Sequence, residues 1–354
     1  MSSVAKYAYI NAKVRGMMGR LLTKEAIDSL IGAESFQTMV RLLEQSPYGP
    51  RLAELPFEEI NSRSLDRVFS EDFIEAFNAV YRSSPNKVRT FLDNVRMKFE
   101  ARTLKTLIRV KVANLPLEEA MRYVIPVGTL TTDLCEELLR KKNLREMVDA
   151  IPIKIFKEAI KEKWRYYEET ENIFPLEVAI DKTAFEEIWR YIEDNMKGVD
   201  KQAAERVVGT EIDTINIKII LRGKSLDLNP STIQDFLLKA KYKLKKEAVE
   251  RSLYTRNITE AAEALAVYPY ETVMHRALRM YEEEKSLTAF EVELDKLVYD
   301  VSRKVGLGYP FQIGTILCYL NLKWFEIKNL KTIVVGKEEK IIPLHIRKYL
   351  IYGE

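Results

Sequence analysis

The sequence predicts an all-α protein, and three observations support that prediction. Apolar side chains recur at helical spacing along almost the whole chain, whereas the alternation typical of half-buried strands is scarce. Hydrophobic residues make up 47% of the 354 residues, which is ample for a substantial core. One amphipathic segment also occurs three times. We therefore expect long helices packed into stiff bundles. Two of the helical stripes are Tyr7, Ile10, Val14, Met17 and Leu21, and Phe156, Ile160, Trp164 and Tyr167.

The repeated segment sets the organisation of the chain. It is EARTLKTLIRVK at 100–111, DTINIKIILRGK at 213–224 and EIKNLKTIVVGK at 326–337, so both intervals are 113 residues. Equal periods of this length indicate three related units. An apolar-Asp-basic triplet upstream of each repeated segment and a proline downstream of it recur at nearly the same interval. The proline suits the first turn of a new helix. These landmarks are Leu65-Asp66-Arg67, Ile180-Asp181-Lys182, Leu294-Asp295-Lys296, Pro116, Pro230 and Pro343.

A pair of short helices is also expected in each unit. The pairs begin near residues 22, 130 and 244, and Ser35, Asn143 and Asn257 are candidate N-caps of the second helices. Pro-Tyr sequences follow two of the pairs and are expected to stop the helices, at Ser46-Pro47-Tyr48 and Tyr268-Pro269-Tyr270.

The two chain ends are predicted to complete one unit together. The last repeat ends soon after Pro343 without a short-helix pair, and the N-terminal segment supplies one at 22–45. The sequence therefore predicts three pseudo-threefold helical-bundle units of about 113–115 residues, closed into a funnel or ring. Their bounds are 1–50 with 269–354, 51–152 and 153–268.

The candidate functional residues belong to the repeated motif. On a helix, its first acid lies at the edge of the apolar stripe, the residue at +3 flanks it, and the lysine at +5 points toward solvent or a partner. The lysine at +11 returns to the stripe, where it can face the C-terminal dipole of its own helix. The acids either tie neighbouring helices together or line a surface that grips another protein; a catalytic role is disfavoured, because no base or nucleophile lies nearby. The candidates are Glu100, Asp213, Asn216, Lys218, Glu326, Asn329 and Lys331.

Composition argues against several other functions. Lys and Arg number 56 against 53 Asp and Glu, which gives little excess charge for neutralising nucleic acid. The lysines of 239–246 spread around the expected helix and indicate a solvated face, although an acidic partner or an anionic surface is an alternative. His275 and His345 have no metal-ligand spacing, and Cys135 and Cys318 are too far apart for a CxxC pair and are expected in the core. No cofactor, metal, small-molecule substrate or enzyme active site is predicted.

The longest uncharged run is 305–322. It contains Pro310, Gln312 and Asn321, so a loop followed by a buried helix is favoured over a membrane span. The N-terminus lacks an apolar signal-peptide core. The protein is expected to be soluble, or at most peripheral to a membrane.

A family resemblance rests on these same residues. The three helical units, the motif Glu/Asp-x-x-Asn-Ile/Leu-Lys-x-Ile/Leu and the ending YPFQIGTILCYLNLKWFEIKNLKTIVVGK at 309–337 resemble the C subunits of archaeal A-type and bacterial V-type ATP synthases, which are related to the vacuolar ATPase d subunit. The resemblance covers essentially the whole chain and is strongest at 209–224 and 309–337.

The resemblance implies a non-catalytic part of a rotary ATP synthase. One copy per complex would sit on the membrane proteolipid ring at the cytoplasmic face and receive the central-stalk subunits in a socket. It would transmit torque between ion translocation and ATP synthesis or hydrolysis. Two alternatives are a freestanding α-helical scaffold that clasps a helical partner, and a nucleic-acid binder using residues 239–246.

Overall fold

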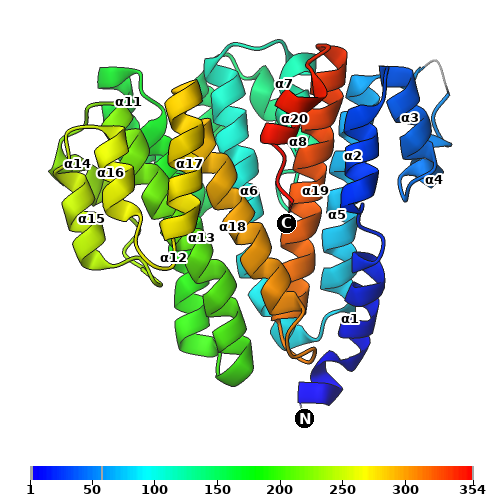
Figure 1. Cartoon of the computed structure of the whole chain (residues 1–354), viewed down its shortest axis with the longest axis horizontal. Coiled ribbons are helices and arrows are strands. Elements are labelled where there is room, and N and C mark those ends of the chain that lie inside the picture. The colour runs from blue at the N-terminus through cyan, green and yellow to red at the C-terminus, as the bar shows by residue number, and fades with distance from the viewer. Residues whose placement is uncertain (1–2, 57–58, 353–354) are drawn as a thin grey trace. The chain divides into compact units, whose positions relative to one another are not determined.

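A computed structural model describes residues 3–56 and 59–352 (Figure 1). Within these ranges the regular elements are twenty helices, and the only β pairing is one isolated bridge between Val127 and Leu130. The predicted all-α fold is therefore confirmed.

The chain divides into two compact units. Residues 1–85 and 299–354 form one, which we call the terminal unit, and residues 86–298 form the other, which we call the middle unit. The finer division into three units, with both chain ends in one of them, and its closure into a funnel stay predictions.

The terminal unit is built around the long helix α19, which packs against α5 and α1. Two polar contacts fasten α1: Lys13 Nζ donates to Ser83 Oγ at 2.7 Å, and the Asn11 side chain donates to the carbonyl of Pro310. Phe73 and Trp324 meet edge to face in the core, with ring centroids 5.2 Å apart. Its helices are α1 (Ser3–Met18), α2 (Lys24–Gly32), α3 (Phe36–Glu44), α4 (Gly49–Leu52), α5 (Ser62–Ser83), α19 (Gly314–Glu338) and α20 (Pro343–Lys348).

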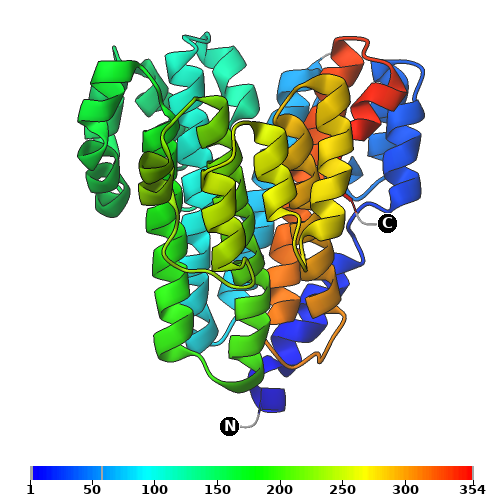
Figure 2. The ribbon, with the colours of Figure 1, turned by 60° about the vertical axis from the view of Figure 1, so that its left-hand side comes forward.

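The middle unit has α12 at its centre, packed against α6, α10 and α13 (Figure 2). The long helices are buried on most sides, whereas the short ones carry a single apolar face. Its helices are α6 (Asn86–Val112), α7 (Leu117–Tyr123), α8 (Thr132–Arg140), α9 (Leu144–Ala150), α10 (Lys154–Glu162), α11 (Trp164–Thr170), α12 (Phe174–Asn195), α13 (Gly198–Ser225), α14 (Pro230–Phe236), α15 (Lys246–Leu253), α16 (Ile258–Leu265) and α17 (Glu271–Glu284). Helix α18 (Thr288–Gly306) begins here and ends in the terminal unit.

Local sequence signals locate the helix starts correctly. Ser35, Asn143 and Asn257 are the N-caps of α3, α9 and α16, and each side chain accepts a backbone N–H three residues on. Pro230 and Pro343 open α14 and α20, and Pro116 immediately precedes α7. These predictions are confirmed.

The lysine-rich segment 239–246 differs from its prediction. Residues 239–245 form an irregular loop, and α15 begins only at Lys246. The backbone N–H groups of this loop are held by a side chain of α13, as described below, and that fixed loop replaces the expected helix.

The uncharged run 305–322 forms the end of α18, a turn and the start of α19. From Gly314 to Ile327, α19 is buried throughout. In the part of the chain that the structure describes, no helix combines the length and apolar character that a membrane crossing requires. Cys135 and Cys318 are buried free thiols, as predicted, and burial raises the pKa of each to about 12.

Candidate functional site

The three motif acids are buried at equivalent places on three long helices. Glu100 on α6, Asp213 on α13 and Glu326 on α19 are 4%, 0% and 6% exposed. Asn216 and Asn329, one turn further on, are also buried. A buried carboxylate costs free energy unless hydrogen bonds replace its hydration, so the donors around each acid define its role.

Asp213 is surrounded mainly by backbone donors. Its carboxylate accepts the N–H groups of Tyr242, Lys243 and Leu244 at 2.9, 2.6 and 2.8 Å, and the hydroxyl of Tyr270 at 2.5 Å. The three amides lie just before α15, whose N-cap Lys245 makes no side-chain cap. Asp213 therefore anchors the entry to α15 from another helix.

Burial of Tyr270 raises the pKa of its phenol, and the negative charge of Asp213 raises it further. The hydroxyl consequently stays a hydrogen-bond donor at any physiological pH. The tyrosine comes from the sequence Tyr268-Pro269-Tyr270, which was expected only to stop a helix.

Glu326 is surrounded mainly by side chains. It accepts the N–H of Leu22 at 2.5 Å, the hydroxyl of Tyr48 at 2.7 Å and the ammonium of Lys323 at 2.8 Å. Lys323 also pairs with Asp72 at 2.5 Å. Burial disfavours the charged ammonium of Lys323, but Glu326 and Asp72 outweigh that penalty, so its pKa is raised. Glu326, Lys323 and Tyr48 thus form a buried cluster, to which the half-buried Asp72 is joined through Lys323.

Glu100 has the fewest strong donors. It accepts the N–H of Thr129 at 2.8 Å, and Arg96 Nε lies 3.8 Å away. Gly128 precedes Thr129 with φ +60°, and a Cβ there would lie 2.3 Å from Glu100 Oε1. Glycine is therefore required for the loop to approach this carboxylate. At the place of the Pro-Tyr tyrosines, this repeat has Ile153 after Pro152.

The residue at +3 binds the backbone 22 positions further along in every copy. Asn216 accepts the N–H of Leu238 at 2.8 Å, and Asn329 accepts the N–H of Ile351 at 2.8 Å and donates to its carbonyl at 2.7 Å. In the first copy Thr103 replaces asparagine and donates to the carbonyl of Ile125 at 2.5 Å. The shared offset shows that this position fastens the segment that returns from the end of each long helix.

The lysine at +11 caps a helix other than its own. Lys111, Lys224 and Lys337 each donate to two carbonyls at the C-terminal end of a short helix, which is the end that a helix dipole makes favourable for a cation. The expectation that this lysine serves its own helix is wrong, because the short helix lies within reach. The acceptor pairs are Leu139 and Lys141 at the end of α8, Leu253 and Thr255 at the end of α15, and Ile31 and Ala33 at the end of α2.

The lysine at +5 pairs with an acid of another helix in the first two copies. Lys105 Nζ lies 2.6 Å from Asp181, and Lys218 Nζ lies 2.6 Å from Asp295. Both acids belong to the apolar-Asp-basic landmarks. Lys218 is thus not directed freely at solvent. Lys331 occupies the corresponding place on α19 and is half-buried.

Two further buried ion-pair sites were not apparent from the sequence. Lys98 Nζ contacts both carboxylate oxygens of Glu211, at 2.9 and 3.0 Å, and burial lowers its pKa to about 8 although Glu211 acts in the opposite direction. Glu177 pairs with Arg109 and with Arg222. Lys98 and Glu211 stand two residues before Glu100 and Asp213, so the 113-residue period could have found them.

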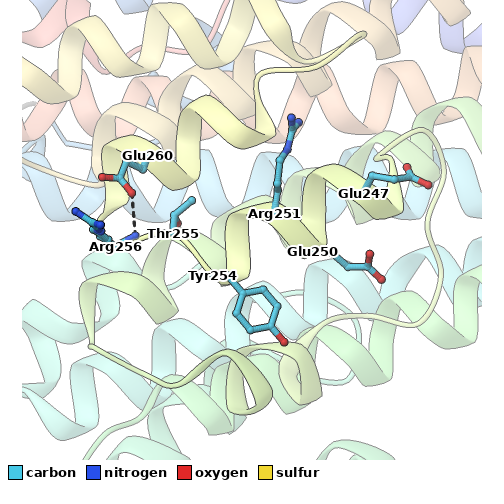
Figure 3. A pocket seen from close by; sticks show the side chains of 7 residues that line it. All are labelled: Glu247, Glu250, Arg251, Tyr254, Thr255, Arg256 and Glu260. Atoms are coloured by element: carbon cyan, nitrogen blue, oxygen red, sulfur yellow. Dashed lines mark hydrogen bonds between the residues drawn. The ribbon is translucent and has the colours of Figure 1, made fainter.

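None of these clusters has the composition of a catalytic or metal site. Within residues 3–56 and 59–352, no group of three or more His, Cys, Asp or Glu side chains could hold a metal ion. An open hollow of about 740 Å³ lies on α15 and the start of α16 (Figure 3). Its lining is charged and mostly exposed, and the one hydrogen bond drawn there joins the Arg256 N–H to Glu260 at 3.0 Å. It offers no nucleophile paired with a base.

Comparison with known proteins gives the family. The model of the ATP synthase (C/AC39) subunit family matches residues 10–349. The chain belongs to this family. The C subunit of the A-type ATP synthase of Methanocaldococcus jannaschii is 30% identical over 348 residues, which are 98% of this chain and 87% of that protein. The equivalent C subunits from Methanothermobacter thermautotrophicus and Pyrococcus abyssi are 26% and 24% identical, and the matches cover 95% and 97% of this chain and 85% and 89% of theirs.

Proposed function

We propose that this protein is a non-catalytic central-stalk subunit of a rotary ATP synthase. It would form the socket that links the central stalk to the membrane proteolipid ring and transmit torque between ion translocation and ATP synthesis or hydrolysis. The observation that carries the proposal is the family match over residues 10–349, together with relatives that are named as C subunits of A-type ATP synthases. The location would be peripheral, at the cytoplasmic face of the membrane.

The internal bonding of the chain supports a mechanical role. Each motif helix is fastened by its acid, its +3 residue and its +11 lysine. Lys105 and Lys218, at +5, add ion pairs with Asp181 and Asp295. Most of these bonds reach a distant segment. Because the tied groups are buried, bending a helix away from its neighbours would break hydrogen bonds that water cannot readily replace. Such a body deforms little under load, as torque transfer requires.

We also propose that the motif acids act as ties between segments. The carboxylates of Asp213 and Glu326 are already occupied by internal donors, so a partner could reach them only after those bonds broke. This favours the hypothesis that the acids join segments of the chain over the alternative that they line a surface that binds another protein.

The first experiment is capture with this chain as tagged bait from its native cell in mild detergent. Recovery of a small, very apolar proteolipid together with central-stalk subunits is the expected result. Recovery from the soluble fraction alone, or with an unrelated helical protein, would favour the freestanding scaffold. Release of nucleic acid with rising salt would favour the nucleic-acid binder.

A second experiment separates tie from partner surface. Glu100→Gln and Glu326→Gln should lower the stability of the chain, while the affinity of the folded variants for the purified stalk proteins stays within about twofold of the unmodified chain. An unchanged melting temperature with a large loss of stalk affinity would contradict the tie. Glu282→Gln, an exposed position on α17, is the matched control.

A further inference from the structure

One end of the terminal unit combines basic side chains with exposed apolar residues at its tip, and the sequence segments that form it contain no acids. Figure 1 places the start of α1, the end of α5 and the turn between α18 and α19 at this end. The contact of Asn11 with Pro310 and that of Lys13 with Ser83 join the three segments. No Asp or Glu occurs in residues 1–24, 76–85 or 301–325. Arg82 lies in the last turn of α5, Arg303 and Lys304 lie in the last turn of α18, and Lys13 of α1 contacts the end of α5 at Ser83.

The turn presents apolar side chains at its tip. Leu307 is 67% exposed and Tyr309 is 48% exposed. The backbone beneath them is held in place: Gly306 packs so closely on Cys318 that an added Cβ would lie 2.4 Å from its sulfur, and Thr315 Oγ1 donates to the carbonyl of Pro310 at 3.4 Å. The exposed leucine and tyrosine are therefore fixed features of the turn.

The corresponding turn of the middle unit differs in charge. Here the end of α12 carries Glu193 and Asp194 and the start of α13 carries Asp200, beside the lysines at 197 and 201. Its exposed apolar residue is Val199, at 47%. The acid-free, aromatic character thus belongs to the turn at 307–311 and is not a general property of these helical hairpins.

We propose that this end of the terminal unit rests on the anionic headgroups of a lipid bilayer. Lys and Arg are attracted to the negative surface potential, and a leucine and a tyrosine at the tip suit the boundary between headgroups and acyl chains. The absence of acids from the three segments makes the charge complementary to lipid, and the nearest acid in sequence on α18 is Asp300. The inference goes beyond the proposed function, because it concerns lipid and not a protein ring.

The test is sedimentation of the full chain with vesicles of phosphatidylcholine alone and of phosphatidylcholine containing about one-third phosphatidylglycerol. The chain should bind the anionic vesicles and not the neutral ones. Arg303→Ser with Lys304→Ser should lower the partition coefficient about 25-fold, which is about fivefold for each charge removed. Leu307→Ser with Tyr309→Ser should lower it about tenfold.

Two control variants match these changes at other exposed positions. Val199→Ser removes an exposed apolar residue from the start of α13 in the middle unit, and Lys241→Ser with Lys245→Ser removes two charges from the lysine-rich loop. Val199→Ser should leave binding unchanged, and the loop variant should lower it less than about twofold. Circular dichroism would verify that each variant is folded.

Three results would overturn the proposal: equal binding to neutral vesicles, no binding to either, or a greater loss in the loop variant than in the Arg303/Lys304 variant. A different outcome is that the chain binds no vesicles but binds the purified proteolipid ring in detergent, and that the Leu307/Tyr309 variant no longer binds the ring. The surface would then recognise protein. That outcome would reject lipid while leaving the proposed function intact.

Discussion

The middle and terminal units bury the same motif acid in different ways. In the middle unit, Asp213 accepts three backbone N–H groups of one loop and a single side-chain donor. In the terminal unit, Glu326 accepts one backbone N–H and two side-chain donors, one of which is charged. The position two residues earlier differs as well: Glu211 forms a buried ion pair with Lys98, whereas Trp324 packs on Phe73.

The comparison shows that the copies of the repeat share the position of the buried acid but not the groups that donate hydrogen bonds to it. In each copy of the repeat a buried anion holds the chain at the entry to a short-helix pair, near Thr129, Leu244 or Leu22. Any donor that reaches the anion can satisfy it, because a charged hydrogen bond in a dry site is strong whether the donor is an amide or a phenol. The donor set therefore decides how much each acid contributes to stability.

The largest effect is expected at Asp213. Asp213→Ala leaves three amides and a phenol without their acceptor in a buried site, so it should cost roughly 3–5 kcal/mol of unfolding free energy. Denaturant unfolding followed by circular dichroism measures this loss. Asp235→Ala, at an exposed position of the same unit, should change stability by less than ~0.5 kcal/mol. Equal losses in the two variants would show that the Asp213 contacts contribute little.

The two tyrosines test the comparison directly. Tyr48→Phe removes one of few donors to Glu326 and should cost about 2 kcal/mol, whereas Tyr270→Phe leaves Asp213 its three amides and should cost about 1 kcal/mol. Each substitution keeps the ring and removes only the hydroxyl, so one variant is the control for the other. The reverse order in thermal or denaturant unfolding would mean that donor number does not decide the cost.

Glu100 should be the least costly acid to remove. It accepts one N–H at 2.8 Å and has a more distant arginine, so Glu100→Ala is expected to cost about 1–2 kcal/mol. Equilibrium unfolding beside Asp213→Ala provides the measurement. A loss as large as that of Asp213→Ala would refute the ranking by donors.

The smallest expected effect is a pH dependence of the middle unit. The folded-state pKa of Lys98 is lowered to about 8 from 10.5, so the unfolded chain binds more protons between these values and stability should rise with pH there. The gain from about pH 7.5 to 9 is about 1 kcal/mol. The measurement is the difference in unfolding free energy, at each pH, between the unmodified chain and the double variant Lys98→Met with Glu211→Leu. This variant lacks the ion pair and should remain folded. A falling or flat difference would contradict the lowered pKa.

Much of the helical framework could be predicted from local sequence. The N-caps Ser35, Asn143 and Asn257 and the all-α class depend on side chains within one helical turn of each other. The 113-residue period also located the buried acids, and the burial of Cys135 and Cys318 followed from their apolar neighbours. The loop at 239–245 was missed, because the pattern of its lysines cannot show that its amides are claimed by Asp213.

The sequence by itself determined the helices, their repeat and the positions that must be buried, because hydrogen bonds within a helix connect residues only four apart. Only the tertiary structure decided which groups meet those positions. Asp213 reaches amides 29–31 residues downstream, and Glu326 reaches Leu22 and Tyr48 near the other end of the chain. Lys337 likewise caps α2 rather than its own helix. These partners depend on how loops close and helices pack, which the spacing of residues along a single helix does not encode.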